Sequence, residues 1–271
     1  MNLPDAPAAP AAAAARLDTL DALRGLAMLW MTAYHLCFDL HWQGHWRQDF
    51  YQDPFWIWQR NAIVGLFLYT AGFSQAVAVA RGQGWPRFGR RWGQIAGCAL
   101  LVSAASLWLF PHSFIYFGVL HGMAVMLPIT RAALLRPRMG AACALAAMGV
   151  AVLALAALAS AWLTRPESAW AAAWLDSRWL NWLGLITQKP VTEDYVPIAP
   201  WLGVLLLGAA AGRWRMQKRQ LQNAALARVT ARNPLTRPLA ALGRWSLPYY
   251  MLHQPVLLGT LMLSGWLAGR M

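Results

Sequence analysis

The sequence predicts an all-α membrane protein, a polytopic bundle of about seven transmembrane helices. Of its 271 residues, 59% are hydrophobic and only 12% are charged, whereas soluble domains carry roughly a quarter charged residues. The apolar residues form several separate runs of about 18 residues or more, the length that an α-helix needs to cross a bilayer. Transmembrane β-strands would instead give alternating segments of roughly ten residues, a pattern that this sequence lacks.

The predicted spans number seven, within a range of six to eight. They cover residues 20–41, 56–80, 93–111, 114–131, 141–163, 197–213 and 245–267. Between spans five and six, "AWAAAWLDSRWLNWLGL" (169–185) carries Trp residues at helical spacing, which indicates an additional helix in the membrane interface. Residues 1–16 are rich in Pro and Ala and predict a disordered tail rather than a signal peptide.

The positive charges predict the orientation of the bundle. With the N-terminus in the cytoplasm, 17 of the 23 Lys and Arg residues fall on the cytoplasmic side, as the positive-inside rule requires. Because topology already accounts for these residues, the net charge of +13 does not indicate a nucleic-acid partner. Cys37, Cys98 and Cys143 lie in apolar runs without metal-ligand spacing, so neither a disulfide nor a metal site is predicted.

The first span carries ionisable residues that a simple membrane anchor does not need. Arg24 and His35 are eleven residues apart, which puts them on one helix face about 16 Å from each other along the axis. Asp39 extends this stripe and is placed to orient or charge-stabilise the His35 imidazole, while Asp21 is placed to pair with Arg24. Ionisable groups at membrane depth are costly unless they are paired or face a wet cavity. The stripe therefore favours a function over a role in helix packing alone.

Two later spans and one loop add further candidates. His121 lies in "FIYFGVLHGMAV" and His253 in "LPYYMLHQP"; each alone is equally compatible with a packing role, but with His35 they indicate a shared polar cavity. The loop "TEDYVPIAPW" places Asp194 and Tyr195 immediately before span six, where acidic and aromatic groups suit a sugar or amine. The alternative for this loop is an ordinary turn at the membrane interface.

Five segments occur together in an order that resembles one known family: "RLDTLDALRGLAMLWMTAYHLCFDL", "FLYTAGFSQAVA", "FIYFGVLHGMAV", "EDYVPIAPWLGVLLLG" and "LGRWSLPYYMLHQPVLL". This is the catalytic-domain family of heparan-α-glucosaminide N-acetyltransferase, in particular its bacterial branch, and the resemblance covers about residues 16–265. It implies a single transmembrane acyltransferase-like domain, residues 17–271, in a bacterial inner membrane. It also implies acetyl-CoA or another acyl-CoA as the donor, no metal, and a carbohydrate or amine acceptor on the far side of the bilayer.

The resemblance nominates more than one catalytic residue. The spacing of Arg24 and His35 is similar to that of membrane acyltransferases that decorate bacterial surface polysaccharides, in which the matching histidine is the acyl-transfer residue. The lysosomal enzyme instead places its active-site histidine in the stretch after the first span, where this chain has His41 and His45. We therefore rank His35 first, His45 second and His41 third.

Acyl transfer from a thioester needs a base for the acceptor and a group that stabilises the developing oxyanion. His35 with Asp39 suits the base role, or His35 can carry the acyl group covalently; the sequence leaves both mechanisms open. Arg24, His121 and His253 are predicted to contact the acyl-CoA donor. A small transporter with a histidine proton relay is the competing hypothesis, and a non-catalytic scaffold is the third. The acceptor, the acyl chain and the oligomeric state are left open.

Overall fold

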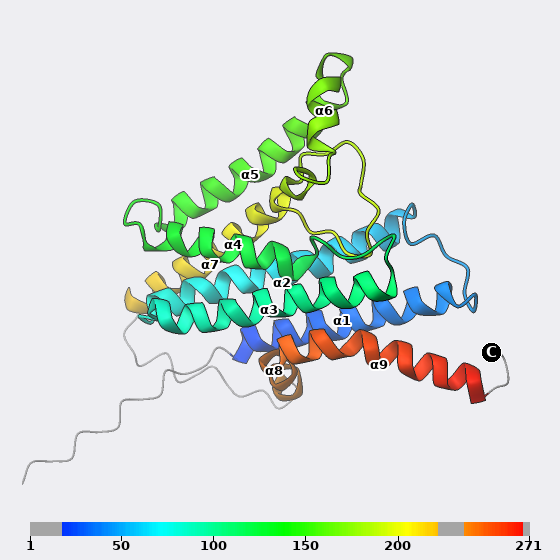
Figure 1. Ribbon diagram of the computed structural model, residues 1–271. Coiled ribbons are helices and arrows are strands. Elements are labelled where there is room, and N and C mark those ends of the chain that lie inside the picture. The colour runs from blue at the N-terminus through cyan, green and yellow to red at the C-terminus, as the bar shows by residue number, and fades with distance from the viewer. Residues whose placement is uncertain (1–17, 222–235, 268–271) are drawn as a thin grey trace, which may run out of the picture.

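The computed structural model describes residues 18–221 and 236–267, which fold into a bundle of helices (Figure 1). No β-strand is present in these two ranges, so the all-helical class is confirmed. The predicted tail, residues 1–16, lies outside the described residues. The helices are α1 (Asp18–Trp42), α2 (Pro54–Ala80), α3 (Trp85–Leu109), α4 (Val119–Leu135), α5 (Ala142–Leu163), α6 (Ala169–Leu175), α7 (Ile198–Leu221), α8 (Arg237–Arg244) and α9 (Ser246–Leu267), with short 3₁₀ turns η1 (Pro166–Ser168) and η2 (Asn181–Leu183).

Each of the seven predicted spans overlaps one of these helices. Within the described residues, three helices are long and apolar enough to cross a membrane, namely α2, α3 and α5, and α4 is a shorter apolar helix. The structure therefore supports a membrane protein, while the count of seven spans stays a prediction.

The predicted start of the fourth span at residue 114 is wrong. The helix begins at Val119, and the chain before it is extended because Phe117 forms an isolated parallel bridge with Tyr195. That pairing satisfies backbone groups that a helix would otherwise use. The segment is apolar in either conformation, so its composition alone cannot separate the two.

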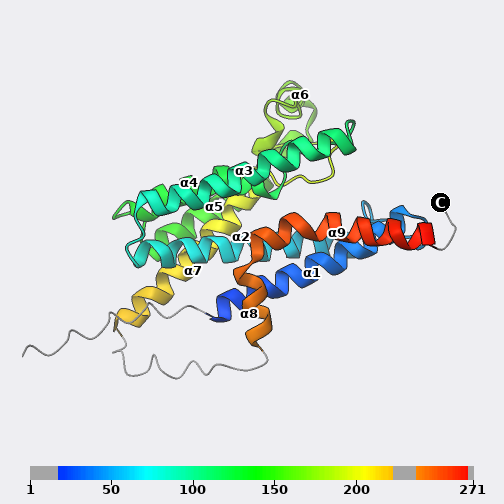
Figure 2. The same cartoon turned by 60° about the horizontal axis from the view of Figure 1, so that its bottom comes forward.

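The Trp-rich segment predicted as an interfacial helix is helical over a shorter range. It forms α6, then irregular chain and η2, and both views show α6 projecting from the bundle (Figures 1 and 2). Trp170, Trp174 and Trp179 are 70%, 69% and 85% exposed. Exposed tryptophans suit the headgroup region of a bilayer, and that location stays a prediction.

Helix α2 lies at the centre of the bundle. It contacts α1, α4 and α7, while α9 packs on α1, α3 on α4 and α5 on α7. Close approach of α2 and α7 depends on Gly72 and Gly208, because a methyl group at either position would overlap a backbone carbonyl oxygen of the other helix. Small residues allow this kind of backbone contact between membrane helices.

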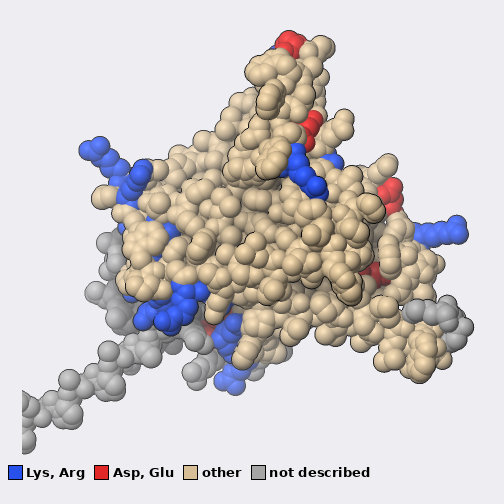
Figure 3. Space-filling model, in the orientation of Figure 1, with Lys and Arg blue, Asp and Glu red and all other residues tan. Residues whose placement is uncertain are grey.

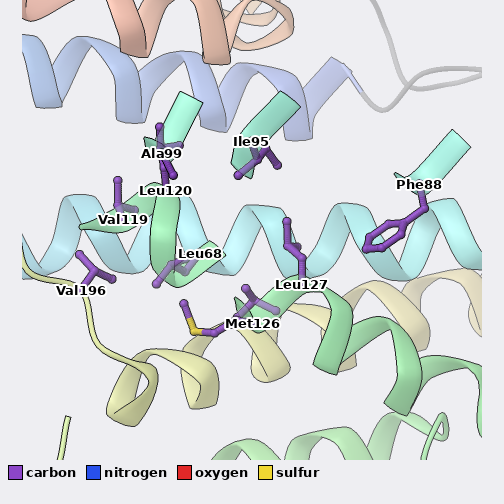
Figure 4. Packing of buried hydrophobic residues seen from close by; sticks show 10 residues of the cluster. Leu68, Phe88, Ile95, Ala99, Val119, Leu120, Met126, Leu127 and Val196 are labelled. Carbon is purple, nitrogen blue, oxygen red and sulfur yellow. The ribbon is translucent and has the colours of Figure 1, made fainter. Parts of the chain in front are cut away.

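A hydrophobic cluster fills the space between α2, α3, α4 and α7 (Figure 4). Side chains from α3 and α4 point towards α2 in this view. The buried members are Leu68, Phe88, Ile95, Ala99, Val119, Leu120, Met126, Leu127, Val196 and Leu205. Part of this cluster forms the apolar wall of the cavity described below.

The two ends of the bundle differ in charge. At one end α1 begins, α2 turns into α3 and α4 terminates, and Lys and Arg side chains gather there (Figures 1 and 3). We call it the basic end and define it by Arg24, Arg91 and Arg131. The opposite end, the far end, carries loops 43–53, 110–118 and 176–197.

Candidate active site

A cavity of about 230 Å³ lies inside the bundle, enclosed by α1, α2, α3, α4 and α9. Its polar lining near the basic end consists of Arg24, Ser74, Gln75, Gln83 and Arg91. Its apolar lining includes Met28, Phe67, Ile95, Leu120, Met123 and Leu127, and Tyr250 lines it from α9. Small-molecule sites commonly combine an apolar wall with a few placed polar groups. This cavity suits a ligand with an apolar part and an anionic end.

Arg24 is held at the basic end of the cavity by two polar partners. Its Nη1 lies 3.1 Å from Asp21 Oδ1, which confirms the predicted pair, and its Nη2 donates to Ser74 Oγ on α2. Arg91 lines the same cavity from α3. Two guanidinium groups at one mouth suit phosphate oxygens. No group of three or more His, Cys, Asp or Glu side chains within residues 18–221 and 236–267 is arranged to hold a metal.

Arg131 supports this end of the cavity from behind. It is 1% exposed, and its guanidinium carbon lies over both the Trp85 and Phe88 rings, 4.8 and 4.7 Å from their centroids. It donates to the side-chain oxygen of Gln83 at 3.4 Å and to the Gln83 carbonyl oxygen. Gln83 itself lines the cavity. Charge counting favoured topology over ligand binding as the role of Arg131 and did not predict this contact.

His35 and His253 come together beyond the Tyr250 wall of the cavity. Their rings lie edge to face with centroids 5.1 Å apart, and the Tyr250 ring lies 5.7 Å from that of His253. His253 Nδ1 lies 2.7 Å from the carbonyl oxygen of Tyr250 and donates to it. In a neutral ring Nε2 then keeps the lone pair; this atom is buried and has no hydrogen-bond partner among the described residues.

The expected direct pairing of Asp39 with His35 is wrong. Asp39 is buried, 3% exposed, and its two carboxylate oxygens accept from Gln254 Nε2 on α9 at 2.9 and 3.1 Å. Asp39 therefore accepts its hydrogen bonds from the Gln254 amide of α9 and not, as helical spacing predicted, from the His35 imidazole. Gln254 was not among the predicted site residues, although it directly follows His253 in the sequence.

Comparison with known proteins identifies the family. The model of the family described as heparan-alpha-glucosaminide N-acetyltransferase, catalytic, matches residues 16–255. The chain belongs to this family. Neither a search of curated proteins nor a search of solved structures found a match. Family membership implies an acetyltransferase, and the matched range contains both the arginines of the basic end and the His35–His253 pair.

In this member of the N-acetyltransferase family, His121 does not lie with the other two histidines. Its Nδ1 accepts from the Gly118 backbone N–H at 3.2 Å, and its Nε2 lies 2.9 Å from Ser103 Oγ. Ser103 Oγ donates onward to the Ile115 carbonyl oxygen at 2.7 Å, so Nε2–H donates to Ser103. Nδ1 therefore caps the start of α4 and Nε2 joins it to α3, which corrects the expected place of His121 in a shared cavity.

His41 lies in the last turn of α1, and His45 lies in the far-end loop that follows it. The His41 ring packs against Phe50, with centroids 5.4 Å apart, and its Nδ1 lies 3.2 Å from the backbone N–H of Gln48. Neither of these two histidines lines the cavity, and nor do His35 and His253. His41 packs against the loop that follows α1, and His45 is exposed.

Asp194 joins the 176–197 loop to α4, whereas the Tyr195 hydroxyl bonds to Asn181 within the same loop. Asp194 Oδ2 accepts from the Val119 backbone N–H at 2.8 Å and so caps α4, while the Tyr195 hydroxyl donates to the Asn181 carbonyl oxygen at 2.5 Å. Burial raises the pKa of Asp194, and the bond from Val119 and the charge of Lys189 offset part of that rise. Because Val119 also lines the cavity, this cap forms part of its far wall. Contact of either side chain with an acceptor stays a prediction.

Proposed function

We propose that this chain is an integral membrane acetyltransferase that takes an acetyl group from acetyl-CoA on the cytoplasmic side and transfers it to a sugar or amine acceptor on the other side. Family membership supports the reaction class. One observation supports the route: a single cavity runs from the arginines of the basic end to Tyr250, which packs against the histidine pair. The concentration of Lys and Arg at the basic end supports placing that end in the cytoplasm, in an inner membrane.

The donor fits this cavity in one direction. Arg24 and Arg91 can bind the phosphates of coenzyme A at the mouth, since guanidinium groups match phosphate geometry. From Arg24 to His35 the helical rise gives about 16 Å along α1, a span that suits the extended pantetheine arm. The thioester would then lie against Tyr250, whose ring contacts His253 of the histidine pair, and the acceptor would enter from the far end, which Asp194 and Tyr195 border.

In the proposed step His35 acts as the general base. The acceptor nitrogen or oxygen attacks the thioester carbonyl carbon while its proton passes to a ring nitrogen of His35. Collapse of the tetrahedral intermediate breaks the carbon–sulfur bond, and the thiolate of coenzyme A takes the proton from His35. His253, in ring contact with His35, keeps a lone pair that stabilises the protonated base. The products are an acetylated acceptor and free coenzyme A.

Binding of acetyl-CoA to purified protein tests the donor site. Substitutions of two neighbouring arginines provide the test variant and its control. Arg91→Gln should weaken binding about tenfold, equivalent to roughly 1.4 kcal/mol, because Arg91 lines the cavity. Arg90→Gln should bind as the wild type does, because Arg90 is exposed and does not line it. Equal losses in both variants would argue against this site. If the wild type binds no acetyl-CoA but mediates proton-coupled flux into liposomes, the transporter hypothesis replaces the proposal.

The same preparation distinguishes the two chemical routes. Incubation with acetyl-CoA in the absence of an acceptor, followed by mass spectrometry of the peptides, should leave His35 unmodified if it acts as a base. An acetyl group on His35 that disappears when an acceptor is added would establish the covalent route instead. Acetylation of His45 would move the chemistry to the far-end loop.

A further inference from the structure

Asp39, Gln254 and His35 form one polar arrangement between α1 and α9. We infer that Gln254 is a positioning residue: Asp39 fixes the orientation of its amide, so that Oε1 faces the His35 imidazole and accepts its N–H. The inference rests on the proposed function, because it concerns the residue proposed as the base. In the inferred arrangement Asp39 orients the Gln254 amide, and Gln254 rather than Asp39 contacts the His35 ring.

The orientation of the amide follows from the chemistry of its partner. Both carboxylate oxygens of Asp39 lie within hydrogen-bond distance of the same nitrogen of Gln254, at 2.9 and 3.1 Å. An ionised carboxylate only accepts hydrogen bonds, so the NH₂ group must face Asp39 and the carbonyl oxygen must face away. A flipped amide would place oxygen against oxygen in a buried site, which is unfavourable.

The carbonyl oxygen of Gln254, which faces away from Asp39, is available to accept a hydrogen bond from His35. Gln254 Oε1 is buried and has no hydrogen-bond partner among the described residues. The Gln254 amide is bonded to Asp39, which lies about one turn beyond His35 on α1. Gln254 also follows His253, whose ring contacts that of His35, so the His35 imidazole is a donor within the same site. The inferred bond from His35 is not formed in this structure, and catalytic hydrogen bonds are often long or poorly aligned before the substrate binds. Acceptance from one ring nitrogen leaves the lone pair on the other, as a base requires.

Packing alone does not require this arrangement. The same two helices are already joined nearer the basic end, where Thr32 Oγ1 and the Tyr249 hydroxyl lie 2.7 Å apart. A buried amide oxygen without a partner is unfavourable for stability. His253, the other ring in the pair, has its own anchor in the Tyr250 carbonyl. The two histidines therefore have separate supports, and His253 provides an internal reference.

Nitrogen NMR of ¹⁵N-histidine-labelled protein in bilayers tests the inference without any enzymatic activity, with His35→Ala to assign the signal. In the wild type, His35 should show one neutral tautomer. In Asp39→Asn the amide of Asn can donate or accept, so Gln254 is free to flip and His35 should show a mixture; Gln254→Met, which keeps the chain length, should do the same. The His253 signal should stay constant. An unchanged His35 signal in both variants would overturn the inference.

Kinetics then connect the tautomer to turnover. Asp39→Asn and Gln254→Met should each lower kcat by about 10- to 100-fold, the usual effect of removing an outer-shell partner, with an unchanged KM for acetyl-CoA. If Asp39 acts through Gln254, the double variant should be no slower than the slower single variant. Losses that multiply would show two independent roles and contradict the inference. Thr32→Val, which removes one hydrogen bond between the same helices, controls for weakened packing.

The two proposals can fail separately. A shift of the His35 tautomer in a protein that transfers no acetyl group would retain the positioning role and reject the proposed function. Acetyl transfer that depends on His35 in a protein whose tautomer does not respond to Asp39 or Gln254 would retain the function and reject the positioning role.

Discussion

The Nδ1 atom of His253 lies 2.7 Å from the carbonyl oxygen of Tyr250, three residues earlier on α9. This bond fixes the orientation of the His253 ring, which lies in edge-to-face contact with His35. Neutral His253 therefore presents a lone pair in a buried position next to the proposed base. The relationship links the wall of the cavity, through Tyr250, to the residue on which the chemistry depends.

Replacement of His253 by Phe separates packing from chemistry in this pair. Phenylalanine keeps a ring beside His35 but removes both nitrogens, so the fold should be retained. We expect kcat to fall at least tenfold, within the usual range for loss of a proton-handling group, while the affinity for acetyl-CoA is unchanged. Steady-state kinetics and a binding titration on the same preparation check this. Wild-type kcat in His253→Phe would exclude His253 from the reaction.

Asp194 contributes to the stability of the folded protein in a pH-dependent way, and this contribution should decrease as the pH rises. Burial raises its pKa in the folded protein above the value of about 3.9 for an unfolded chain. The folded state therefore binds the proton more tightly, so this contribution is complete below the unfolded pKa and is lost as the pH rises through the folded pKa. The melting temperature of the wild type relative to Asp194→Asn should fall across that window. A constant or rising difference would contradict the assignment.

Gly118 should tolerate no side chain, because a methyl group there would overlap the Asp194 carboxylate that caps α4. Gly118→Ala should lower the free energy of unfolding by about 1 kcal/mol or more, the usual effect of losing a helix cap. Gly259→Ala on α9 is the matched control, since a methyl group at that position meets nothing within 4 Å. It should raise stability by up to about 1 kcal/mol through helix propensity. Equal effects of both substitutions would exclude the steric explanation.

Arg131 should affect donor binding without touching the donor. Arg131→Lys keeps the charge but has no planar guanidinium to lie over the Trp85 and Phe88 rings or to reach both oxygens of Gln83. We expect a loss of about 1–3 kcal/mol in the free energy of unfolding and a higher KM for acetyl-CoA, because Gln83 lines the cavity. Thermal denaturation and initial rates measure the two effects. A normal KM in the destabilised variant would show that the α2–α3 turn does not shape the site.

Local periodicity predicted the helix that carries the site. The stripe of Arg24, His35 and Asp39 and the pair with Asp21 depend only on spacing along one helix, and α1 is continuous across all four residues. The partners of these groups come from elsewhere. Gln254, which bonds to Asp39, is 215 residues away, so no spacing rule within a span could have found it.

The errors have the same physical origin. His121 has the apolar surroundings of a membrane site, but its nitrogens are used by Gly118 and by Ser103 of α3. Likewise the residues before Val119 are apolar enough for a helix, and only their pairing with the loop at Tyr195 makes them extended. Both outcomes depend on contacts between different segments of the chain. Composition and periodicity carry no information about such contacts.

The most direct test of the account is sided acetyl transfer in proteoliposomes of known orientation. Labelled acetyl-CoA is supplied at the basic end of the protein, and a panel of amino sugars and polysaccharide fragments is supplied at the far end, for the wild type and His35→Ala. The account predicts that label crosses to an acceptor in the wild type and that folded His35→Ala transfers none. Undiminished transfer by His35→Ala, or transfer only when donor and acceptor share one side, would contradict it.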